Sequence, residues 1–288
     1  MLRFSSAVPT ASLLTALLIS AALASQSVSA EMNATTRSLV ESAMAGEHRS
    51  DENKARDQYR KPLETLEFLG LDSGMTVVEI WPGGGWYSEI LAPVLKDDGL
   101  FYAAQFDING PFGYQRRGLG AFLSKAGAEP DLYRDMVITE FEMPYKIDIA
   151  PQGSVDMILT FRNVHNLVME YNGGGRYADL AFQVMYDTLK PGGILGVVDH
   201  EWDDVDTEDP LSANGYISRA RTIAFAEKAG FELAGESEIL HNPKDSKDHP
   251  AGVWTLPPSY ARGDEDRDKY AAIGESDRFL LKFVKPAG

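Results

Sequence analysis

The sequence predicts an α/β domain built on a seven-stranded, mostly parallel sheet with helices on both faces and an antiparallel last strand. Short apolar segments alternate with stretches of helical periodicity from residue 51 onward, and such alternation is typical of parallel sheets covered on both faces. The last two apolar segments are joined by a long polar connection, which indicates the antiparallel finish. Ligands of such sheets lie beyond the carboxyl ends of the strands, so the residues that follow each strand are candidates for function.

The individual elements follow from hydrophobic periodicity and from the glycines that interrupt it. In 51–71, apolar side chains recur at steps of three and four residues and Gly70 follows them, which predicts a helix and its end. The expected strands are one ending near residue 80 and six more at 99–107, 136–141, 155–161, 194–199, 231–240 and 278–286. Further helices are expected at 88–95, in a stretch ending near 132, at 174–189 and at 216–229.

These elements form one domain. Residues 51–288 contain all the predicted strands, and no internal repeat or second domain is evident. The preceding segment, 31–50, is polar and is expected to be flexible. A polar stretch rich in Asp, Lys and Pro, 241–277, reads as an insertion that either covers the site or only decorates the domain.

Residues 1–30 are predicted to be a secretory signal peptide. The stretch has one positive charge, Arg3, no acidic residue, an apolar core over about 13–23, and small residues that suit cleavage after Ala24 or Ala30. The apolar run is short for a membrane span, and a membrane anchor is the alternative. Because a twin-arginine pair is missing, we expect Sec-type export of an unfolded chain to the periplasm or the exterior.

Composition excludes several classes of function. The chain has no cysteine, which excludes disulfides, thiol catalysis and cysteine-based metal sites. Its formal net charge is −16, whereas nucleic-acid binding requires a basic surface, and an anionic membrane surface would repel the chain. We therefore expect a small-molecule substrate as the partner, no nucleic acid, and no stable membrane insertion after cleavage of the signal peptide.

A glycine-rich turn, Gly83 to Gly85, follows the first predicted strand and precedes a helix. Glycines allow a ligand to approach the backbone closely, and the helix start offers free N–H groups. Glu79, at the strand end, can accept hydrogen bonds from an amino group. A dinucleotide site fits poorly because Ser88 replaces the third glycine of that fingerprint. A tight turn without a ligand is the other alternative.

Six segments, in chain order, resemble the motif series of class I S-adenosylmethionine-dependent methyltransferases. They are VVEIWPGGGWYSEIL (77–91), GLFYAAQFD (99–107), ITEFEMP (138–144), SVDMILTFRNVHNL (154–167), LKPGGILGVVDHEW (189–202) and AGFELAGES (229–237). The resemblance covers 51–286 and is closest to exported bacterial proteins described as predicted methyltransferases. It implies a Rossmann-like class I methyltransferase fold, S-adenosylmethionine as the cofactor, and methyl transfer as the activity.

The resemblance also assigns residues to the cofactor. They are Glu79, Gly83, Gly84 and Gly85 for the methionine part, Gln105 or Asp107 for the ribose, Glu140 and Phe141 for the adenine, and Asn163 with His165 for the methyl-donor end. Two positions depart from the family. Trp81 replaces its usual first glycine and should narrow the site, and Gln105 stands where an acid is commonest. Arg56, Tyr59 and Arg60 precede the first strand, where such folds often have a cap.

Two histidines directly follow predicted strands and should face one crevice. They are His165 in RNVHNL and His200 in VDHEW, where Asp199 and Glu201 flank the second. Histidine can take a proton from a substrate hydroxyl or amine near neutral pH, and Asp199 could orient it, so these three are the candidate catalytic residues. The same side chains suit a divalent ion, but no metal-ligand spacing is present and we predict no metal. A structural role for either histidine is the other alternative.

The predicted export conflicts with the predicted cofactor, because S-adenosylmethionine is made in the cytoplasm. Three functions therefore stay open: methyl transfer to a small molecule or envelope component, ligand binding without catalysis, and another reaction, by a hydrolase or lyase, that uses His165 and His200. We favour methyl transfer, because Glu79, the glycines, Glu140 and the LKPGG turn occur together.

Overall fold

The computed structural model describes Met1 and residues 32–170 and 177–288. The strands are β1 (Thr76–Ile80), β2 (Leu100–Gln105), β3 (Val137–Glu140), β4 (Val155–Phe161), β5 (Leu189–Trp202), β6 (Ile217–Ser218), β7 (Glu232–Ser237), β8 (Pro250–Val253) and β9 (Arg278–Val284). The helices are α1 (Ala34–Ala45), α2 (Asp51–Lys54), α3 (Asp57–Arg60), α4 (Pro62–Leu69), α5 (Ser88–Leu95), α6 (Gly113–Ala128), α7 (Pro130–Tyr133), α8 (Val164–Val168), α9 (Ala178–Thr188), α10 (Arg219–Ala229) and α11 (Arg267–Ile273).

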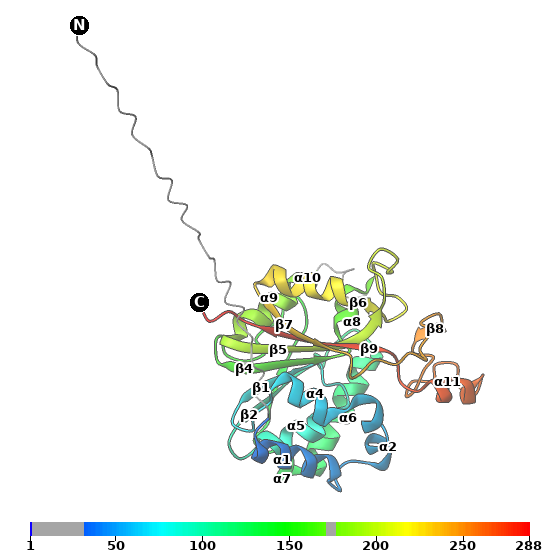
Figure 1. Cartoon of the computed structure of the whole chain (residues 1–288). Helices are drawn as coiled ribbons and strands as arrows, with labels where there is room; N and C mark the ends of the chain where they lie inside the picture. Colours follow the sequence, from blue (N-terminus) through cyan, green and yellow to red (C-terminus); the bar gives the residue numbers. More distant parts are fainter. Residues whose placement is uncertain (2–31, 171–176) are drawn as a thin grey trace.

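All the described strands except β8 form one central sheet with helices on both faces (Figure 1). Within the described residues, seven strands run in the order β3-β2-β1-β4-β5-β9-β7, and the short strand β6 pairs with β5. The pairs from β3 to β5 are parallel, whereas β9 is antiparallel to both of its neighbours. The mostly parallel sheet with an antiparallel last strand is therefore confirmed.

The order in which strands are added to the sheet reverses between β1 and β4. It moves outward from β1 to β2 and β3, and then returns to the other side of β1 to form β4 and β5. Ile80 of β1 lies opposite Thr160 of β4, so the two strands end side by side. A crevice at such a switch point is the usual ligand site of this type of sheet.

Alternate side chains of the central strand β1 enter two hydrophobic cores. Val78 and Ile80 join the core that includes residues of α9 and α10, whereas Val77 joins the core that includes residues of α4 and α5. Figure 1 shows these two pairs of helices on opposite faces of the sheet. Burial of one such side chain contributes about 1.5–3 kcal/mol. Burial on both faces explains the nearly continuous apolar run of this strand.

The segment 31–50, which was expected to be flexible, instead contains the 12-residue helix α1. The side chain of Asn33 caps this helix by accepting a hydrogen bond from the N–H of Thr36. Thr36, Val40 and Ala43 are buried, and the helix packs against α5. The expectation was wrong because these three buried positions form only a narrow stripe on a helix whose other residues are mostly exposed.

Some predicted boundaries also differ. The turn 191–193 was expected to precede the fifth strand, whereas β5 contains it as an irregularity: Val155 pairs with Leu189, but Met157 pairs with Ile194. The signal peptide, apart from Met1, and the start of the predicted helix 174–189 lie outside the described residues. Among the helices of 32–170 and 177–288, none combines the length and apolarity needed to cross a membrane.

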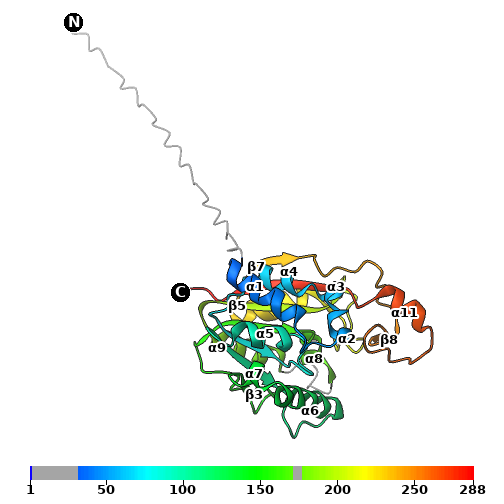
Figure 2. The ribbon, with the colours of Figure 1, turned by 90° about the horizontal axis from the view of Figure 1, so that it is seen from below.

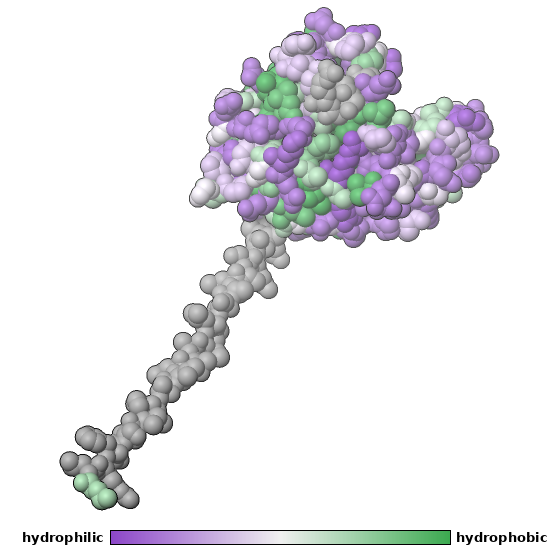
Figure 3. Space-filling view, turned by 90° about the horizontal axis from the view of Figure 1, so that it is seen from above, coloured by the Kyte–Doolittle hydropathy of each residue, from purple (hydrophilic) through white to green (hydrophobic). Residues whose placement is uncertain are grey.

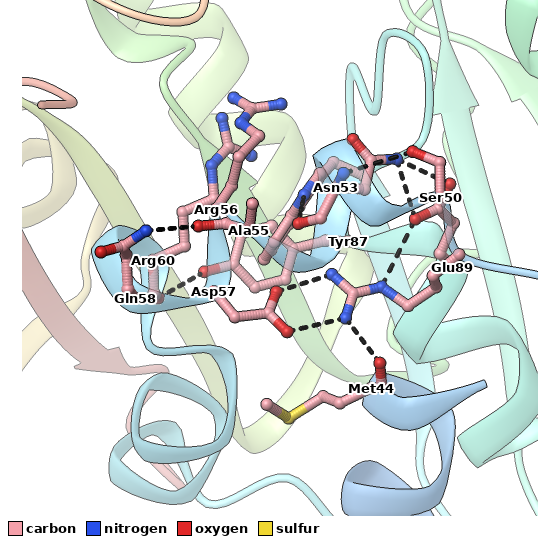
Figure 4. A network of polar contacts seen from close by, with 12 residues as sticks. Met44, Ser50, Asn53, Ala55, Arg56, Asp57, Gln58, Arg60, Tyr87 and Glu89 are labelled. Carbon is pink, nitrogen blue, oxygen red and sulfur yellow. Dashed lines mark hydrogen bonds and ion pairs between the residues drawn. The ribbon is translucent and has the colours of Figure 1, made fainter. Parts of the chain in front are cut away.

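Two segments that are far apart in the sequence lie at one end of the molecule. Figures 1 and 2 both place α2 near β8 and α11. A buried arginine holds the N-terminal segment in place: the guanidinium of Arg49 donates to both carboxylate oxygens of Asp57, at 2.9 and 2.7 Å, and to the carbonyl oxygen of Met44. Glu89 of α5 pairs with Arg49 and accepts hydrogen bonds from Asn53 (Figure 4). This network fixes the segment around 49–60 against α5.

Candidate functional site

A cavity of about 390 Å³ lies at the switch point between β1 and β4. Its volume falls in the range of about 300–1,000 Å³ that is usual for small-molecule sites. The turn after β1, the segment after β4 and His200 of β5 form its inner walls, and the N-terminal segment from Asn53 to Arg60 closes one side. The topology therefore brings together the segments that the sequence singled out.

The connection between β7 and β9 covers part of this cavity. Val253, Trp254 and the Pro257-Pro258 pair line its wall. Buried Asp245 anchors the connection by accepting hydrogen bonds from the Tyr216 hydroxyl at 3.1 Å, the Asp277 N–H at 2.8 Å and the His249 ring at 2.7 Å. The sequence left open whether 241–277 covers the site, and the structure shows that part of it does.

Glu79 lies at the end of β1 with its side chain facing the cavity and almost fully buried. The hydroxyl of Ser88, at the start of α5, donates a hydrogen bond to its Oε2 at 2.5 Å. Burial raises the pKa of Glu79 to about 7, against the lowering effects of Ser88 and of the charge of Lys125. A cationic group in the cavity would favour the ionised carboxylate, so Glu79 is suited to bind an ammonium group.

The three glycines of the turn differ in their structural roles. Gly83 and Gly84 line the cavity, and Gly83 has a positive φ of 58°. Gly85 does not line the cavity: its φ is 78°, and a Cβ there would lie 2.8 Å from the ring of Phe122. Only the first two glycines therefore present backbone to a ligand, while the third is required for packing.

Trp81 fills the side of the cavity where the resemblance expects the adenine. Its indole lies 5.5 Å from the rings of both Phe106 and Phe141, between centroids, and its Nε1 donates to the carbonyl oxygen of Phe141 at 2.7 Å. The backbone of Trp81 has a φ of +44°, which is strained for a bulky residue. Phe141 is fully buried and does not reach the cavity. Trp81 thus forms part of the cavity wall, and a narrowing of the site by this residue stays a prediction.

The residues expected at the ribose and adenine are engaged elsewhere. Gln105 is buried and donates to the carbonyl oxygen of Gly83 at 2.7 Å, so it supports the glycine turn from behind. Asp107 and Glu140 both form ion pairs with Lys146, whose Nζ lies 2.8 Å from Asp107 and 2.7 Å from Glu140. None of the side chains of Gln105, Asp107 and Glu140 lines the cavity. The structure therefore fits the methionine part of the cofactor, whereas the adenosine part would need the indole of Trp81 to move.

His165 and Asp199 form a hydrogen-bonded pair. Nδ1 of His165 lies 2.7 Å from Oδ1 of Asp199, whose oxygens also accept the backbone N–H groups of His165 and His200 at 3.0 and 2.8 Å. A carboxylate with three donors around it is an acceptor only, so the proton belongs on Nδ1 of His165. The lone pair is then on Nε2, and His165 lines the cavity. This arrangement suits a general base.

His200 lies beside this pair but has a different environment. Its ring centroid is 5.3 Å from that of His165, and its Nδ1 is hydrogen-bonded to the hydroxyl of Ser276. Burial, and then the charges of His165 and nearby arginines, lower the pKa of His200 well below its ordinary value. His200 is therefore neutral at physiological pH and can serve as a hydrogen-bonding partner for a substrate.

The three candidate catalytic residues could also approach a metal ion. Ligand atoms of His165, Asp199 and His200 lie within 4.8 Å of one another. However, the oxygens of Asp199 are already engaged by three N–H groups. This hydrogen bonding favours the acid–base interpretation, and the absence of a metal stays a prediction.

Sequence reasoning missed two arginines that line the cavity, Arg162 and Arg278. Arg162 directly follows β4, which was a usable signal. Arg278 begins β9, and its place could not be read locally, because it depends on β9 running antiparallel to β5. Of the three residues expected in a cap, Arg56 and Arg60 line the cavity, whereas Tyr59 does not.

Comparison with known proteins bears on the fold. No protein-family model matches the chain, and no curated protein matches it in sequence. A S-adenosylmethionine-dependent methyltransferase from Aquifex aeolicus is similar in structure, with a TM-score of 0.51 and 18% identity, over 80% of this chain and 93% of its own. The [4+2]-cyclase SpnF gives a TM-score of 0.53 and 17% identity over 88% and 94%.

A third similar structure is phosphoethanolamine N-methyltransferase 2 from Haemonchus contortus in complex with S-adenosyl-L-methionine. Its TM-score is 0.51 at 15% identity, over 79% of this chain and 53% of its own. Identities this low show a shared fold and not a shared reaction. The protein therefore has the fold of class I S-adenosylmethionine-dependent methyltransferases.

Proposed function

We propose that the protein is an S-adenosylmethionine-dependent methyltransferase that acts on a small molecule or a component of the cell envelope. The observation that carries the proposal is that the His165–Asp199 pair and Glu79 meet at one cavity at the switch point of this fold. The likeness to solved methyltransferases supports the cofactor, although such a fold by itself leaves the chemistry open.

The residues of the cavity divide into a cofactor side and a substrate side. S-adenosylmethionine, when bound, supplies a methyl group on a positively charged sulfur. Glu79 would accept hydrogen bonds from the ammonium of its methionine part, the backbone at Gly83 and Gly84 would lie against that part, and Asn163 would lie near its methyl-donor end. Trp81 would turn away from Phe141 to admit the adenosine part.

His165 would move the proton of the reaction. Its Nε2 would take the proton from the acceptor oxygen or nitrogen as that atom bonds to the methyl group and the bond between methyl and sulfur breaks. The positive charge that forms on the ring would be stabilised by Asp199, which also fixes the ring orientation. Acid–base assistance of this kind contributes about 10²–10⁴-fold to a rate. Neutral His200 would orient the acceptor.

A reaction without S-adenosylmethionine is the second candidate, and Trp81 is the observation that favours it. Its indole fills the adenine side of the cavity and is held by the carbonyl oxygen of Phe141. The similar [4+2]-cyclase indicates that the fold also occurs in a protein named for another reaction. In this case His165 and Asp199 would act on a substrate that occupies the cavity alone.

We also propose that residues 1–30 direct export. The test is expression of the full chain in a bacterium, followed by cell fractionation and determination of the N-terminal residue. We expect a periplasmic or secreted product that begins after Ala24 or Ala30. A full-length product confined to the cytoplasm would contradict this.

Calorimetric titration of the purified protein with S-adenosylmethionine and S-adenosylhomocysteine tests the main proposal. Micromolar binding that is lost in Glu79→Ala supports it. Absence of binding at millimolar ligand, with a folded protein by circular dichroism, would sink it and leave the second candidate.

A further inference from the structure

Four arginines meet at the cavity from separate parts of the chain. Arg56 and Arg60 extend from the N-terminal segment, on the side away from Asp57 (Figure 4). Arg162 directly follows β4, and Arg278 begins β9, whose start lies at the same edge of the sheet because β9 is antiparallel. We call Arg56, Arg60, Arg162 and Arg278 the arginine cluster.

One carboxylate, Glu275, is paired with the arginine cluster. It binds Arg56 at 2.6 Å and Arg60 at 3.1 Å, and it also binds Arg278. In the part of the chain that the structure describes, no other carboxylate forms an ion pair with these four arginines. The cluster thus keeps an excess of positive charge after Glu275 is counted.

Several donors of the cluster have no partner among the described residues. Nη2 of Arg60 and Nε of Arg278 are buried and make no hydrogen bond to a described residue. Both side chains are only 3% exposed, so solvent offers these donors little compensation. The guanidinium of Arg162 likewise forms no ion pair or hydrogen bond within 32–170 and 177–288. Buried charged donors without acceptors are costly, and a ligand with acceptor oxygens would satisfy them.

The cluster contrasts with the rest of the molecule. The chain as a whole has a net charge of −16, whereas the cluster is positively charged. Figure 3 shows a face on which hydrophilic residues surround several hydrophobic patches. Within the cavity, burial lowers the pKa of Arg60, and burial together with the charge of Arg278 lowers the pKa of Arg162 to about 10. Burial is the main cause of both shifts, and the charges of neighbouring arginines outweigh part of the opposing effect of Glu275.

The backbone of Arg162 supports a ligand-binding role. Its φ is +64°, a left-handed conformation that costs a non-glycine residue energy. Its N–H is held by the carbonyl oxygen of Val198 at 2.7 Å, which maintains that conformation at the end of β4. Such strain persists where neighbouring structure imposes it and is common in ligand sites.

We propose that the arginine cluster is a subsite for an oxyanion group, a phosphate monoester or a carboxylate, on the molecule that this enzyme acts on. A doubly charged phosphate group matches the excess positive charge better than a single carboxylate. Planar guanidinium groups bind either group through paired hydrogen bonds. As a statement about the methyl acceptor, the proposal rests on the proposed function; as a statement about anion binding, it stands alone.

The carboxylate of S-adenosylmethionine is the competing occupant. Arg60 is close enough to Glu79 to affect its pKa, so the cluster borders the place where we expect the methionine part. One carboxylate would leave most of the excess positive charge uncompensated. The two occupants differ in whether they need Arg162, which lines the cavity together with His165 and whose guanidinium has no hydrogen-bonding partner among the described residues.

Isothermal titration of the full chain with inorganic phosphate, and with acetate, tests the subsite at constant ionic strength set by sodium chloride. We expect phosphate to bind more tightly than acetate. Arg162→Gln should weaken phosphate binding about tenfold or more, since it removes a charged hydrogen-bonding partner. Arg134→Gln, which removes an exposed arginine paired with exposed Asp135, is the matched control and should leave phosphate affinity unchanged. Arg162→Lys should retain part of the affinity.

The same variants titrated with S-adenosylhomocysteine and 5′-methylthioadenosine separate the two occupants. If Arg162→Gln weakens only the first, which alone carries a carboxylate, the cluster serves the cofactor and the proposal is overturned. Phosphate binding no stronger than that of chloride, or unchanged in Arg162→Gln, also overturns it. If neither nucleoside binds while phosphate binds through Arg162, the methyltransferase assignment fails and the anion subsite stands.

Discussion

His165 Nδ1 lies 2.7 Å from Asp199 Oδ1, and Asp199 reaches no part of the cavity wall itself. The carboxylate acts on the substrate only through the ring that it orients. Its other partners are backbone N–H groups of the two histidines. The position of the base is thus set by a group that no ligand touches, and binding and proton transfer can be separated by mutation.

Asp199→Asn should impair proton transfer without impairing ligand binding. An amide in place of the carboxylate presents a weaker acceptor to Nδ1 or a donor that forces the other tautomer, and it cannot stabilise a charged ring. We expect the rate with any acceptor to fall by about 10²–10⁴-fold, with unchanged affinity for S-adenosylhomocysteine. The tautomer of His165, read from its ring ¹⁵N shifts, should change in parallel. Glu201→Gln, at a carboxylate paired with Arg219, is the control; an unchanged tautomer in Asp199→Asn would contradict the assignment.

Glu79→Gln should stabilise the folded protein in a pH-dependent way. Burial raises the pKa of Glu79 from 4.5 to about 7, so the unfolded chain releases this proton at a lower pH than the folded protein. The free energy of unfolding therefore falls as the pH rises from about 4.5 to about 7. Glutamine removes this loss, which amounts to about 3 kcal/mol at pH 8. Urea unfolding at pH 4 and pH 8 measures it.

The wild-type protein and Glu79→Gln should differ little in stability at pH 4, where the Glu79 carboxyl group is mostly protonated in both the folded and the unfolded state. A stabilisation of equal size at both pH values would mean that ionisation of Glu79 is not its cause. The variant should also bind S-adenosylhomocysteine more weakly, because the amide cannot pair with an ammonium group. Stability and binding should thus move in opposite directions.

Trp81→Gly should open the adenine side of the cavity. Loss of a buried tryptophan costs about 3–5 kcal/mol, and relief of the positive φ returns about 1–2 kcal/mol, so a moderate loss of stability is expected. If the protein binds S-adenosylhomocysteine, the variant should bind it at least about tenfold more tightly, since no indole has to be displaced. Trp81→Phe, which keeps a ring at this position, is the control. Tighter binding in both variants, or in neither, would argue against the indole as the barrier.

Asp245→Asn should loosen the connection that covers the cavity. Asp245 accepts hydrogen bonds from the Tyr216 hydroxyl, the His249 ring and the Asp277 N–H, and replacement of a buried charged acceptor with several donors costs about 2–4 kcal/mol. Denaturant unfolding measures this, and hydrogen exchange should increase between β7 and β9. Asp248→Asn, at an exposed position bonded to Ser246, should change neither quantity. Equal effects of the two substitutions would contradict the anchoring role.

The sheet and the place of the site could be predicted because their signals are local. A parallel strand that is covered on both faces needs apolar residues on both, so the segment VVEI indicates β1. The glycines that follow it indicate the turn. His165 and His200 could be grouped because parallel strands end at one edge of a sheet. The structure brings these two rings to a centroid distance of 5.3 Å.

The features that were missed depend on contacts between distant segments. Helix α1 packs against α5 and buries Thr36, Val40 and Ala43, and its own composition does not reveal this. The orientation of Trp81 is set by Phe106 and Phe141, and the convergence of Arg162 with Arg278 follows from the direction of β9. No periodicity within a single segment carries such information.

Strand β9 lies between β5 and β7, which has a consequence for the order in which the molecule can be assembled. During synthesis from the N-terminus, the edge of β5 that pairs with β9 stays open until β9 emerges, and exposed strand edges are prone to wrong pairing. Arg278, Glu275 and Ser276 arrive with this strand, so the cavity is completed at the same step that closes the sheet. The arginine cluster is therefore incomplete until the last strand is in place, so anion binding through Arg278 would report on the completed fold.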